Sequence, residues 1–341
     1  MDDPDGADDD GVHGGSADDE HETAGPAPWP EEPAESGIRS GFVTFVGRPN
    51  VGKSSLVNAI CGTKVSIVSD KPQTTRHRIM GVRSRPGSQI VFVDTPGLHK
   101  AVTALGERVN ATALSSVAGS TASEGASASG GDRRGADGGE AATDVDVVAL
   151  VLDATTPFGS GDRWVASQLD VSDAIVVVNK IDRATPAQVL AMLGAASELG
   201  AAEYFPVSAR THDGLDALVD HLLARLAPGP RYFPDDQVSD LGEERWVAEL
   251  VREQLLAVTR DELPYSIATQ VVEWEWPRIR VDVIVERDSQ KGMVIGKGGS
   301  VLKRAGERAR AQLPEGVFLE LRVKVDKDWQ RRPERVERLG Y

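Results

Sequence analysis

Cysteine is almost absent from this chain of 341 residues, which has only Cys61. A single cysteine excludes a disulfide framework and any zinc site built from several cysteines. The longest apolar runs are far shorter than the ~20 residues of a membrane-spanning helix. The first residues also lack the basic and then apolar stretch of a signal peptide. We therefore expect a protein of the reducing cytoplasm.

Lysine and arginine are absent from residues 1–38, whereas residues 1–37 carry 13 acidic side chains. Taking these 13 charges from the formal net charge of −15 leaves −2 for residues 38–341. The acidity therefore belongs to one segment, and each segment has to be interpreted separately. Because that segment is rich in Gly, Pro, Asp and Glu and has almost no large apolar side chain, we predict that residues 1–37 are disordered.

From residue 42 onwards, apolar runs typical of buried parallel strands alternate with segments of helical periodicity. This alternation predicts an α/β domain over residues 38–228, with a mostly parallel sheet and helices on both faces. Residues 115–143, of which 22 of 29 are Gly, Ala, Ser or Thr, interrupt it, and we predict a flexible surface insertion there. Strands are predicted at 42–46, 90–93, 147–152, 175–178 and 203–207, and helices at 53–60, 186–199 and 215–226.

A linker at residues 229–240, which begins in a Pro-Gly-Pro stretch at 228–230, precedes a second, α+β module at residues 241–341. Trp274 and Trp276 alternate on one predicted strand, so we predict core packing for both. Helices are predicted at 243–259 and 301–313, and strands at 266–274, 279–286 and 317–325.

Residues 47–54 match the pattern G-x-x-x-x-G-K-[ST] between the first predicted strand and helix, which is the context of a phosphate-binding P-loop. Glycines let backbone N–H groups turn toward phosphates, and the helix N-terminus adds partial positive charge. Lys53 would neutralise the β- and γ-phosphates, and the Ser54 hydroxyl would ligate Mg²⁺. With the next residue, this predicted phosphate site comprises Gly47, Arg48, Pro49, Asn50, Val51, Gly52, Lys53, Ser54 and Ser55.

A second phosphate-facing segment follows the strand at 90–93, because an Asp at such a strand end faces the phosphate site. Asp94 is predicted to hold Mg²⁺ through water, and Gly97 to offer its N–H to the γ-phosphate. Leu98 stands where Ras-like GTPases carry the glutamine that positions water, so hydrolysis needs another group, an ion or a partner. The segment comprises Asp94, Thr95, Pro96, Gly97 and Leu98.

A polar stretch between these two segments matches a first switch loop, which the γ-phosphate and Mg²⁺ order. One threonine should complete the Mg²⁺ shell; we favour Thr75, and Thr74 is the alternative. The predicted switch residues are Gln73, Thr74, Thr75, Arg76 and His77.

Asn179, Lys180 and Asp182 form the pattern N-K-x-D after the strand at 175–178. A carboxylate accepts from both donors of the guanine edge, whereas adenine has no such pair, so Asp182 is predicted to select the base. Asn179 would tie loops together, and the Lys180 stem would pack over the base. Ser208, Ala209 and Arg210 follow the last strand, and a backbone N–H there would reach guanine O6. In this order the motifs resemble those of translation-factor-type GTPases, so we expect GTP rather than ATP.

The second module contains a G-x-x-G loop followed by a basic helix. Residues 291–313 carry six basic side chains against one acidic one, which is the charge pattern expected for binding a phosphate backbone. A KH domain clamps single-stranded nucleic acid over such a loop, and Met293 and Ile295 would flank an apolar groove for bases. The alternative is a glycine turn beside a solvated basic helix. The predicted RNA-binding residues are Met293, Ile295, Gly296, Lys297, Gly298, Gly299, Lys303 and Arg304.

A GTPase domain followed by a KH domain resembles the Era family, bacterial GTPases of small-subunit ribosome assembly. Besides the P-loop, close local matches lie at residues 73–79, 94–100, 105–108, 262–266, 294–299 and 338–341. The resemblance implies hydrolysis of GTP to GDP with Mg²⁺, and binding of the 30S subunit through 16S rRNA near its 3′ end. Some members are reported at the inner face of the cell membrane, so it implies peripheral membrane contact besides a cytoplasmic location. We expect a monomer.

Related GTPases with asparagine at the position of Asn50 use its carbonyl to hold K⁺, so K⁺ is a second expected cofactor. The acidic segment and the insertion are unusual for the family. Two other functions stay open. One is an RNA-binding protein whose GTP site is a sensor with negligible turnover. The other is a tRNA-modification or iron-transport GTPase, which tandem G domains or membrane spans would favour.

Overall fold

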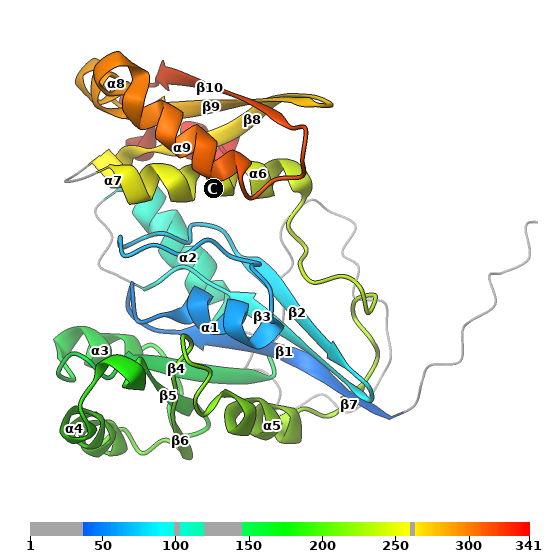
Figure 1. Cartoon of the computed structure of the whole chain (residues 1–341). Helices are drawn as coiled ribbons and strands as arrows, with labels where there is room; N and C mark the ends of the chain where they lie inside the picture. Colours follow the sequence, from blue (N-terminus) through cyan, green and yellow to red (C-terminus); the bar gives the residue numbers. More distant parts are fainter. Residues whose placement is uncertain (1–36, 99–102, 119–144, 260–262) are drawn as a thin grey trace, which may run out of the picture. The chain divides into compact units, whose positions relative to one another are not determined.

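Two β-sheets, each with its own helices, make up the part of the chain described by the computed structural model (Figure 1). The described residues are 37–98, 103–118, 145–259 and 263–341. The predicted disorder up to residue 36 and most of the predicted insertion, 119–143, lie outside them, as do His99, Lys100 and Glu262 of the quoted matches.

The first sheet has the strand order β2-β3-β1-β4-β5-β6. The strands β1, β3, β4, β5 and β6 are parallel, β2 is antiparallel to β3, and β7 pairs with the start of β1 in antiparallel fashion. The bounds are β1 (Ile38–Val46), β2 (Ile79–Arg85), β3 (Ser88–Asp94), β4 (Val147–Asp153), β5 (Ile175–Asn179), β6 (Glu203–Pro206) and β7 (Pro228–Gly229).

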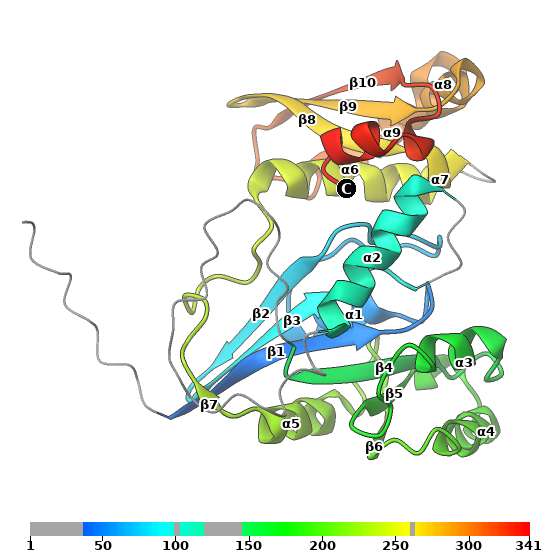
Figure 2. The ribbon, with the colours of Figure 1, turned by 180° about the vertical axis from the view of Figure 1, so that it is seen from behind.

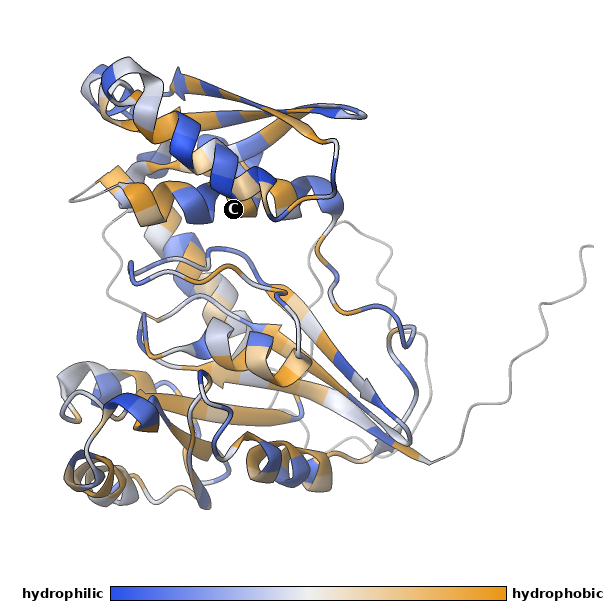
Figure 3. Ribbon diagram, in the orientation of Figure 1, coloured by the Kyte–Doolittle hydropathy of each residue, from blue (hydrophilic) through white to orange (hydrophobic). Residues whose placement is uncertain are grey.

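Helices cover both faces of this sheet, and each face has its own apolar core. On one face, α1 (Lys53–Cys61) and α5 (Leu215–Arg225) pack against Phe45, Phe92 and Val151. On the other face, residues of α2 (Ala104–Ala118), α3 (Ser160–Ala166) and α4 (Pro186–Ser197) join Leu150 and Val178. The view from behind shows α2 on the side opposite α1 (Figure 2). The central strands of the first sheet are mostly hydrophobic, as expected for parallel strands that are buried on both faces (Figure 3).

The second sheet has the order β10-β9-β8, with β8 antiparallel and β10 parallel to β9. Residues of α6, α7, α8 and α9 bury one face of it, and residues of η4, α10 and α2 cover part of the other. The helices are α6 (Glu243–Val258), α7 (Leu263–Ser266), α8 (Asp288–Ile295), α9 (Ser300–Arg310) and α10 (Pro333–Arg338), with short 3-10 turns η2 (Ile181–Arg183), η3 (Lys297–Gly299) and η4 (Trp329–Arg331). The strands are β8 (Ala268–Glu275), β9 (Arg278–Val285) and β10 (Phe318–Val325).

The predicted fold class, a P-loop domain with a mostly parallel sheet followed by an α+β module of KH order, is confirmed. Two details of the prediction are wrong. Residues 115–118 are not part of a loop, because they continue α2. Trp276 is not in the core: β8 ends at Glu275, and Trp276 lies 61% exposed in the turn before Pro277, whereas Trp274 packs against the core.

Candidate nucleotide site and nucleic-acid groove

The P-loop joins β1 to α1 and wraps around the ammonium group of Lys53. Lys53 Nζ donates to the carbonyl oxygens of Gly47 and Arg48, both at 3.1 Å. Burial lowers the pKa of Lys53 to about 8, and the nearby Asp94 opposes that shift. Gly52 has φ of +102°, and a Cβ there would lie 2.3 Å from the side-chain nitrogen of Asn179. The loop therefore holds a buried cation where an anion can neutralise it.

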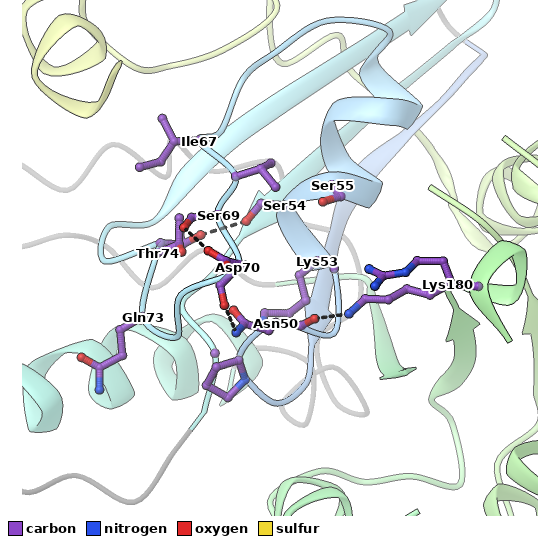
Figure 4. Close-up of a pocket in the computed structure, with 16 residues that line it drawn as sticks. Asn50, Lys53, Ser54, Ser55, Ile67, Ser69, Asp70, Gln73, Thr74 and Lys180 are labelled. Atoms are coloured by element: carbon purple, nitrogen blue, oxygen red, sulfur yellow. Dashed lines mark hydrogen bonds between the residues drawn. The ribbon is translucent and has the colours of Figure 1, made fainter. Parts of the chain in front are cut away.

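A cavity of about 410 Å³ opens above this loop (Figure 4). The P-loop supplies one wall, the segment from Ile67 to Thr75 supplies another, and Lys180 and Arg183 stand at the far end. Its lining residues are Pro49, Asn50, Gly52, Lys53, Ser54, Ser55, Ile67, Val68, Ser69, Asp70, Gln73, Thr74, Thr75, Gly97, Lys180 and Arg183. The predicted P-loop, switch and Asp94–Leu98 segments thus meet around one cavity.

Three oxygen-bearing side chains gather where a Mg²⁺ ion is expected. The hydroxyl oxygens of Ser54 and Thr75 lie 2.8 Å apart. Asp94 is fully buried at the end of β3, and among the described residues neither of its carboxylate oxygens has a hydrogen-bond partner of ordinary geometry. Burial raises the pKa of Asp94, while the hydroxyls of Ser66 and Ser54 and the charge of Lys53 lower it. A buried carboxylate beside two hydroxyls fits a small hard cation that takes oxygen ligands.

The alternative threonine, Thr74, is engaged elsewhere, because its hydroxyl donates to the carbonyl of Lys71 at 2.6 Å. Leu98 is 1% exposed and belongs to the apolar core under α2 and α3. Its side chain therefore presents nothing polar to the cavity. Asn50 has φ of +66° and donates from its side-chain amide to the carbonyl of Asp70 at 2.7 Å, so the P-loop contacts the switch loop.

The N-K-x-D residues brace the P-loop against the rest of the sheet. The side chain of Asn179 donates to the carbonyl of Val51 at 3.0 Å and accepts the N–H of Ala209 at 3.1 Å. Lys180 donates to the carbonyl of Asn50 at 2.5 Å and to the carboxylate of Asp153 at 2.6 Å. Asn179 thus ties the P-loop to the loop after β6.

Asp182 is held by the loop that follows β6. It accepts the hydroxyl of Ser208 and the guanidinium of Arg210, each at 2.6 Å. The hydrogen bond from Ser208 and then the charge of Arg210 hold the pKa of Asp182 below its ordinary value. The carboxylate is thus ionised and oriented at neutral pH, which is the state required to accept the two N–H donors of guanine.

Arg48 of the P-loop is anchored to α3. Its Nε donates at 2.7 Å to Asp162, whose side chain is 1% exposed, and its guanidinium also reaches the Thr156 hydroxyl at 3.4 Å. The second carboxylate oxygen of Asp162 accepts the N–H of Gly159 at the start of α3. Arg48 is predicted from sequence for the phosphate site, but no local pattern indicates this buried partner.

The switch loop also contacts the second module. Arg76 is 3% exposed and donates to the carbonyls of Ile267 and Tyr265 at 2.7 and 2.8 Å. Arg252 of α6, itself fully buried, donates to the carbonyl of Thr74. Residues on both sides of Thr75 are therefore fixed by the KH-like module.

A groove of about 400 Å³ runs between α9 and β10. Of the predicted RNA-binding residues, Gly299 and Lys303 line it, whereas Met293 is exposed on α8 and Arg304 is exposed but does not line it. Most of the wall was not predicted from sequence, although the alternating pattern of β10 places Leu319 and Leu321 on one face. The lining is Gly299, Leu302, Lys303, Gly306, Glu307, Arg310, Leu319 and Leu321.

The G-x-x-G loop lies at the end of this groove, between α8 and α9. Gly296, Gly298 and Gly299 all have positive φ, and a Cβ on Gly298 would meet nothing within 4 Å. Lys297 is exposed beside it. An open backbone next to an exposed ammonium group lets a phosphate approach closely.

The chain matches two family models, one described as a 50S ribosome-binding GTPase over residues 42–180 and one described as a KH domain over residues 262–330. It is 45% identical over 323 residues to the GTPase Era of Mycobacterium sp. (strain KMS), which covers 90% of this chain and 100% of that protein. The GTPase Era of Mycobacterium tuberculosis (strain ATCC 25177 / H37Ra) is 44% identical, covering 89% of this chain and 99% of that one.

Two solved structures have the same fold. One is Era in complex with MgGDPNP and nucleotides 1506–1542 of 16S ribosomal RNA, with a TM-score of 0.78 and 36% identity. The other is a variant of Aquifex aeolicus Era bound to GDP and AlF4⁻, with a TM-score of 0.77 and 35% identity. In both comparisons 89% of this chain and 99% of the other chain are covered.

Proposed function

The chain belongs to the GTPase Era family, and from that premise we propose that it hydrolyses GTP and uses its nucleotide state to control binding of 16S rRNA near the 3′ end in the small ribosomal subunit. The observation that carries the proposal is the direct contact of the switch loop with the KH-like module through Arg76 and Arg252. The solved relative holds a GTP analogue and 16S rRNA in one complex.

Lys53, Ser54 and Thr75, which line the cavity, and Asp94 and Asp182, which do not, have different roles in the proposed reaction. Lys53 and the N–H groups of the P-loop bind the β- and γ-phosphates, and Asp182 selects guanine. Ser54, Thr75 and Asp94 would hold Mg²⁺, which supplies positive charge to the phosphate oxygens as the leaving group departs. Because Leu98 offers no polar atom to orient water, we expect slow intrinsic hydrolysis that a further group accelerates.

We further propose K⁺ as that further group, held by the side-chain carbonyl of Asn50 and the backbone carbonyl of Asp70. The two residues are already in contact at the edge of the cavity. A cation there would supply charge that an arginine finger supplies elsewhere. Exchanging K⁺ for Na⁺ at constant ionic strength should lower the hydrolysis rate at least about tenfold, and an unchanged rate would remove K⁺ from the proposal.

RNA binding is proposed for the groove and the G-x-x-G loop. Changing Lys297 and Gly298 together to Asp should lower RNA affinity about a hundredfold and leave GTP affinity unchanged, because phosphate contacts dominate such binding. Arg338→Asp, an exposed charge reversal on α10 that changes the net charge by two units where the double variant changes it by three, is the control. Equal losses in both variants would show that net charge alone, and not the loop, governs affinity.

A separate experiment tests which ribosomal subunit the protein binds. It is needed because the family that matches the G domain is described as 50S ribosome-binding, whereas the solved relative holds 16S rRNA. Crosslinking in cells followed by sequencing of the bound RNA should recover the 3′ end of 16S rRNA. Recovery of 23S rRNA instead would contradict the assignment to the small subunit.

The second candidate function is an RNA-binding protein in which GTP is a regulatory signal with negligible turnover, and the buried Leu98 favours it. Single-turnover hydrolysis with and without small subunits separates the two functions. We expect subunits to accelerate hydrolysis at least about tenfold. If subunits change nucleotide affinity but not the rate, the sensor function is correct.

The cytoplasmic location, the peripheral contact with the membrane and the monomeric state stay proposals drawn from the family resemblance. Within the described ranges, no helix is long and apolar enough to cross a membrane. Fractionation of lysed cells and light scattering of the purified protein test the location and the oligomeric state.

A further inference from the structure

Glu253 of α6 contacts the wall of the nucleotide cavity from the KH-like module. The residue is buried, and one of its carboxylate oxygens accepts the backbone N–H of Val68 at 3.0 Å. Ile67 and Val68 both line the cavity above the P-loop (Figure 4). Part of the nucleotide site is therefore held by a residue that lies 185 positions further along the chain.

The wall segment between α1 and the switch loop contains no helix or strand, so its shape depends on side-chain contacts. The first domain anchors it at two points. Asn58 of α1 accepts the N–H of Ser66 at 2.9 Å, and Asn50 of the P-loop donates to the carbonyl of Asp70 at 2.7 Å. Val68 lies between these anchors, and the α6 carboxylate supplies the contact that fixes it.

Lys64 connects Glu253 to the end of α9. Its ammonium group donates to the second carboxylate oxygen of Glu253 at 2.5 Å and to the side-chain oxygen of Gln312 at 2.6 Å. Gln312 follows the last turn of α9, and its amide donates to the carbonyl of Arg308 at 3.3 Å. Arg310 in that turn lines the proposed RNA groove. A series of direct contacts thus runs from the end of α9 to the cavity wall.

We propose that Glu253 is a positioning residue of the nucleotide site, through which the KH-like module controls nucleotide release. Through Lys64 and Gln312, the position of the Val68 wall depends on the last turn of α9. RNA phosphates bound to the basic side chains of α9 would order that turn, so RNA in the groove should slow nucleotide release. The RNA effect rests on the RNA binding proposed above, whereas the contact of Glu253 with the wall does not. This route is separate from the contacts of Arg76.

The first experiment measures release of a fluorescent GDP analogue from the full chain after addition of excess unlabelled GDP, without RNA. Glu253→Ala should release the analogue roughly tenfold faster than the unmodified protein, because the Val68 N–H loses its acceptor and the wall becomes mobile. Glu253→Gln keeps the volume and one oxygen acceptor but loses the charge that holds Lys64, so it should give an intermediate rate.

The same measurement with a saturating concentration of RNA tests the connection to α9. The probe has the sequence of the RNA in the solved relative, nucleotides 1506–1542 of 16S rRNA. RNA should slow release from the unmodified protein about fivefold. In Gln312→Leu, release without RNA should stay within about twofold of the unmodified rate, and the RNA effect should disappear. Loss of stability alone would not remove the response to RNA in a variant whose release without RNA is normal.

Glu273→Ala is the matched control. Glu273 of β8 forms a half-buried ion pair with Arg280 at 2.5 Å, and its ion-pair partners among the described residues all lie in the second module. The substitution should change neither the release rate nor the effect of RNA. Thermal unfolding of each variant reports whether its fold is intact.

Three results would overturn the role of Glu253 or its connection to α9. Release from Glu253→Ala at the unmodified rate would show that the contact with Val68 does not position the wall. Equal acceleration in Glu273→Ala would show a general loosening of the module. RNA that binds without slowing release would remove the connection to α9. Absence of RNA binding would contradict the proposed function and the RNA effect together, and the rates without RNA would still decide the role of Glu253.

Discussion

At the scale of single residues, the site contains buried charges that a ligand of opposite charge can neutralise. Lys53 and Asp94 lie near each other in the P-loop region, yet neither forms an ion pair shorter than 4 Å with the other among the described contacts. Buried charges normally pair or lose their charge. A phosphate bound to Lys53 and a cation bound to Asp94 would neutralise both buried charges, so we expect the site to be more stable with its ligands than without them.

Asp182→Asn should transfer the preference of the site from GTP to XTP. The amide can donate to the 2-oxygen of xanthine, whereas opposite guanine it meets two donors with only one acceptor oxygen. We expect GTP affinity to fall at least about a hundredfold and XTP to bind more tightly than GTP. Competition binding with the two nucleotides measures it, and retained selectivity for guanine would contradict the assignment.

Arg210→Ala is the control for that substitution. It removes the ion pair on Asp182 but keeps the carboxylate, and Arg210 is 69% exposed, where ion pairs contribute little. GTP affinity should stay within about threefold of the unmodified protein. A large loss would show that Arg210, and not only Asp182, reads the base.

At the scale of elements, sequence reasoning succeeded where one force dominates. The parallel strands β3, β4 and β5 are apolar runs because both faces are buried, whereas β6 at the edge is only half-buried; all five parallel strands were found within a few residues. The strand β2 was missed, since an edge strand with alternating small and charged residues such as Gly81 and Arg83 lacks that signal. Trp276 was wrongly predicted to pack in the core, because the alternation of residues in the sequence continues beyond the end of β8.

Motif spacing located the cavity but not its supports. The patterns around Lys53, Asp94 and Asp182 depend on local sequence, so they can be recognised in one chain. Their partners come from other elements, and some of these, such as Asp162 for Arg48, lie more than 100 residues away. No local pattern marks them, and only the folded sheet brings them to the same edge.

Asp162→Ala tests the support that α3 gives to the P-loop. It leaves the Arg48 guanidinium and the N–H of Gly159 without their buried acceptor, so we expect a loss of about 2–4 kcal/mol in unfolding free energy. GTP affinity should fall about threefold to tenfold as Arg48 becomes mobile. Urea unfolding and nucleotide titration measure the two effects.

Asp170→Ala is the control, because Asp170 is exposed and, among the described residues, accepts only from Ser172 in its own turn. It should change the unfolding free energy by less than about 0.5 kcal/mol. Equal effects of the two substitutions would show that Asp162 contributes no more than a surface turn residue.

At the scale of the whole molecule, the switch loop is where the two modules depend on each other. Arg76 lies over the rings of Trp329 and Tyr341, and Leu105 of α2 belongs to the same apolar cluster as these two aromatic residues. These contacts join residues up to about 260 positions apart, which is why no sequence pattern indicated them. Thr75 is already within hydrogen-bond distance of Ser54. If loss of the γ-phosphate releases Thr75 from this position, the cluster around Arg76 has to adjust, and this is the physical route for coupling that we propose.

His77 makes this contact sensitive to acid. Its ring stacks on Tyr341 with centroids 4.6 Å apart. Burial lowers the pKa of His77 to about 4; Glu249 opposes this shift, while Arg245, Arg252 and Arg76 reinforce it. In the unfolded chain His77 takes up a proton near pH 6.5, whereas in the folded chain it does so only near pH 4. The contribution of neutral His77 to the unfolding free energy is therefore fully present above pH 6.5 and is lost as the pH falls toward 4.

We expect the unfolding free energy to fall by up to about 3 kcal/mol from this residue alone between pH 6.5 and 4. His77→Gln removes the titration, so its stability should decline less steeply over that interval, even if it starts lower because the stack on Tyr341 is lost. Urea unfolding at half-unit steps of pH measures both curves. Parallel curves would show that His77 is as accessible to protons in the folded chain as in the unfolded one, and hence that the switch loop is not held against the second module in solution.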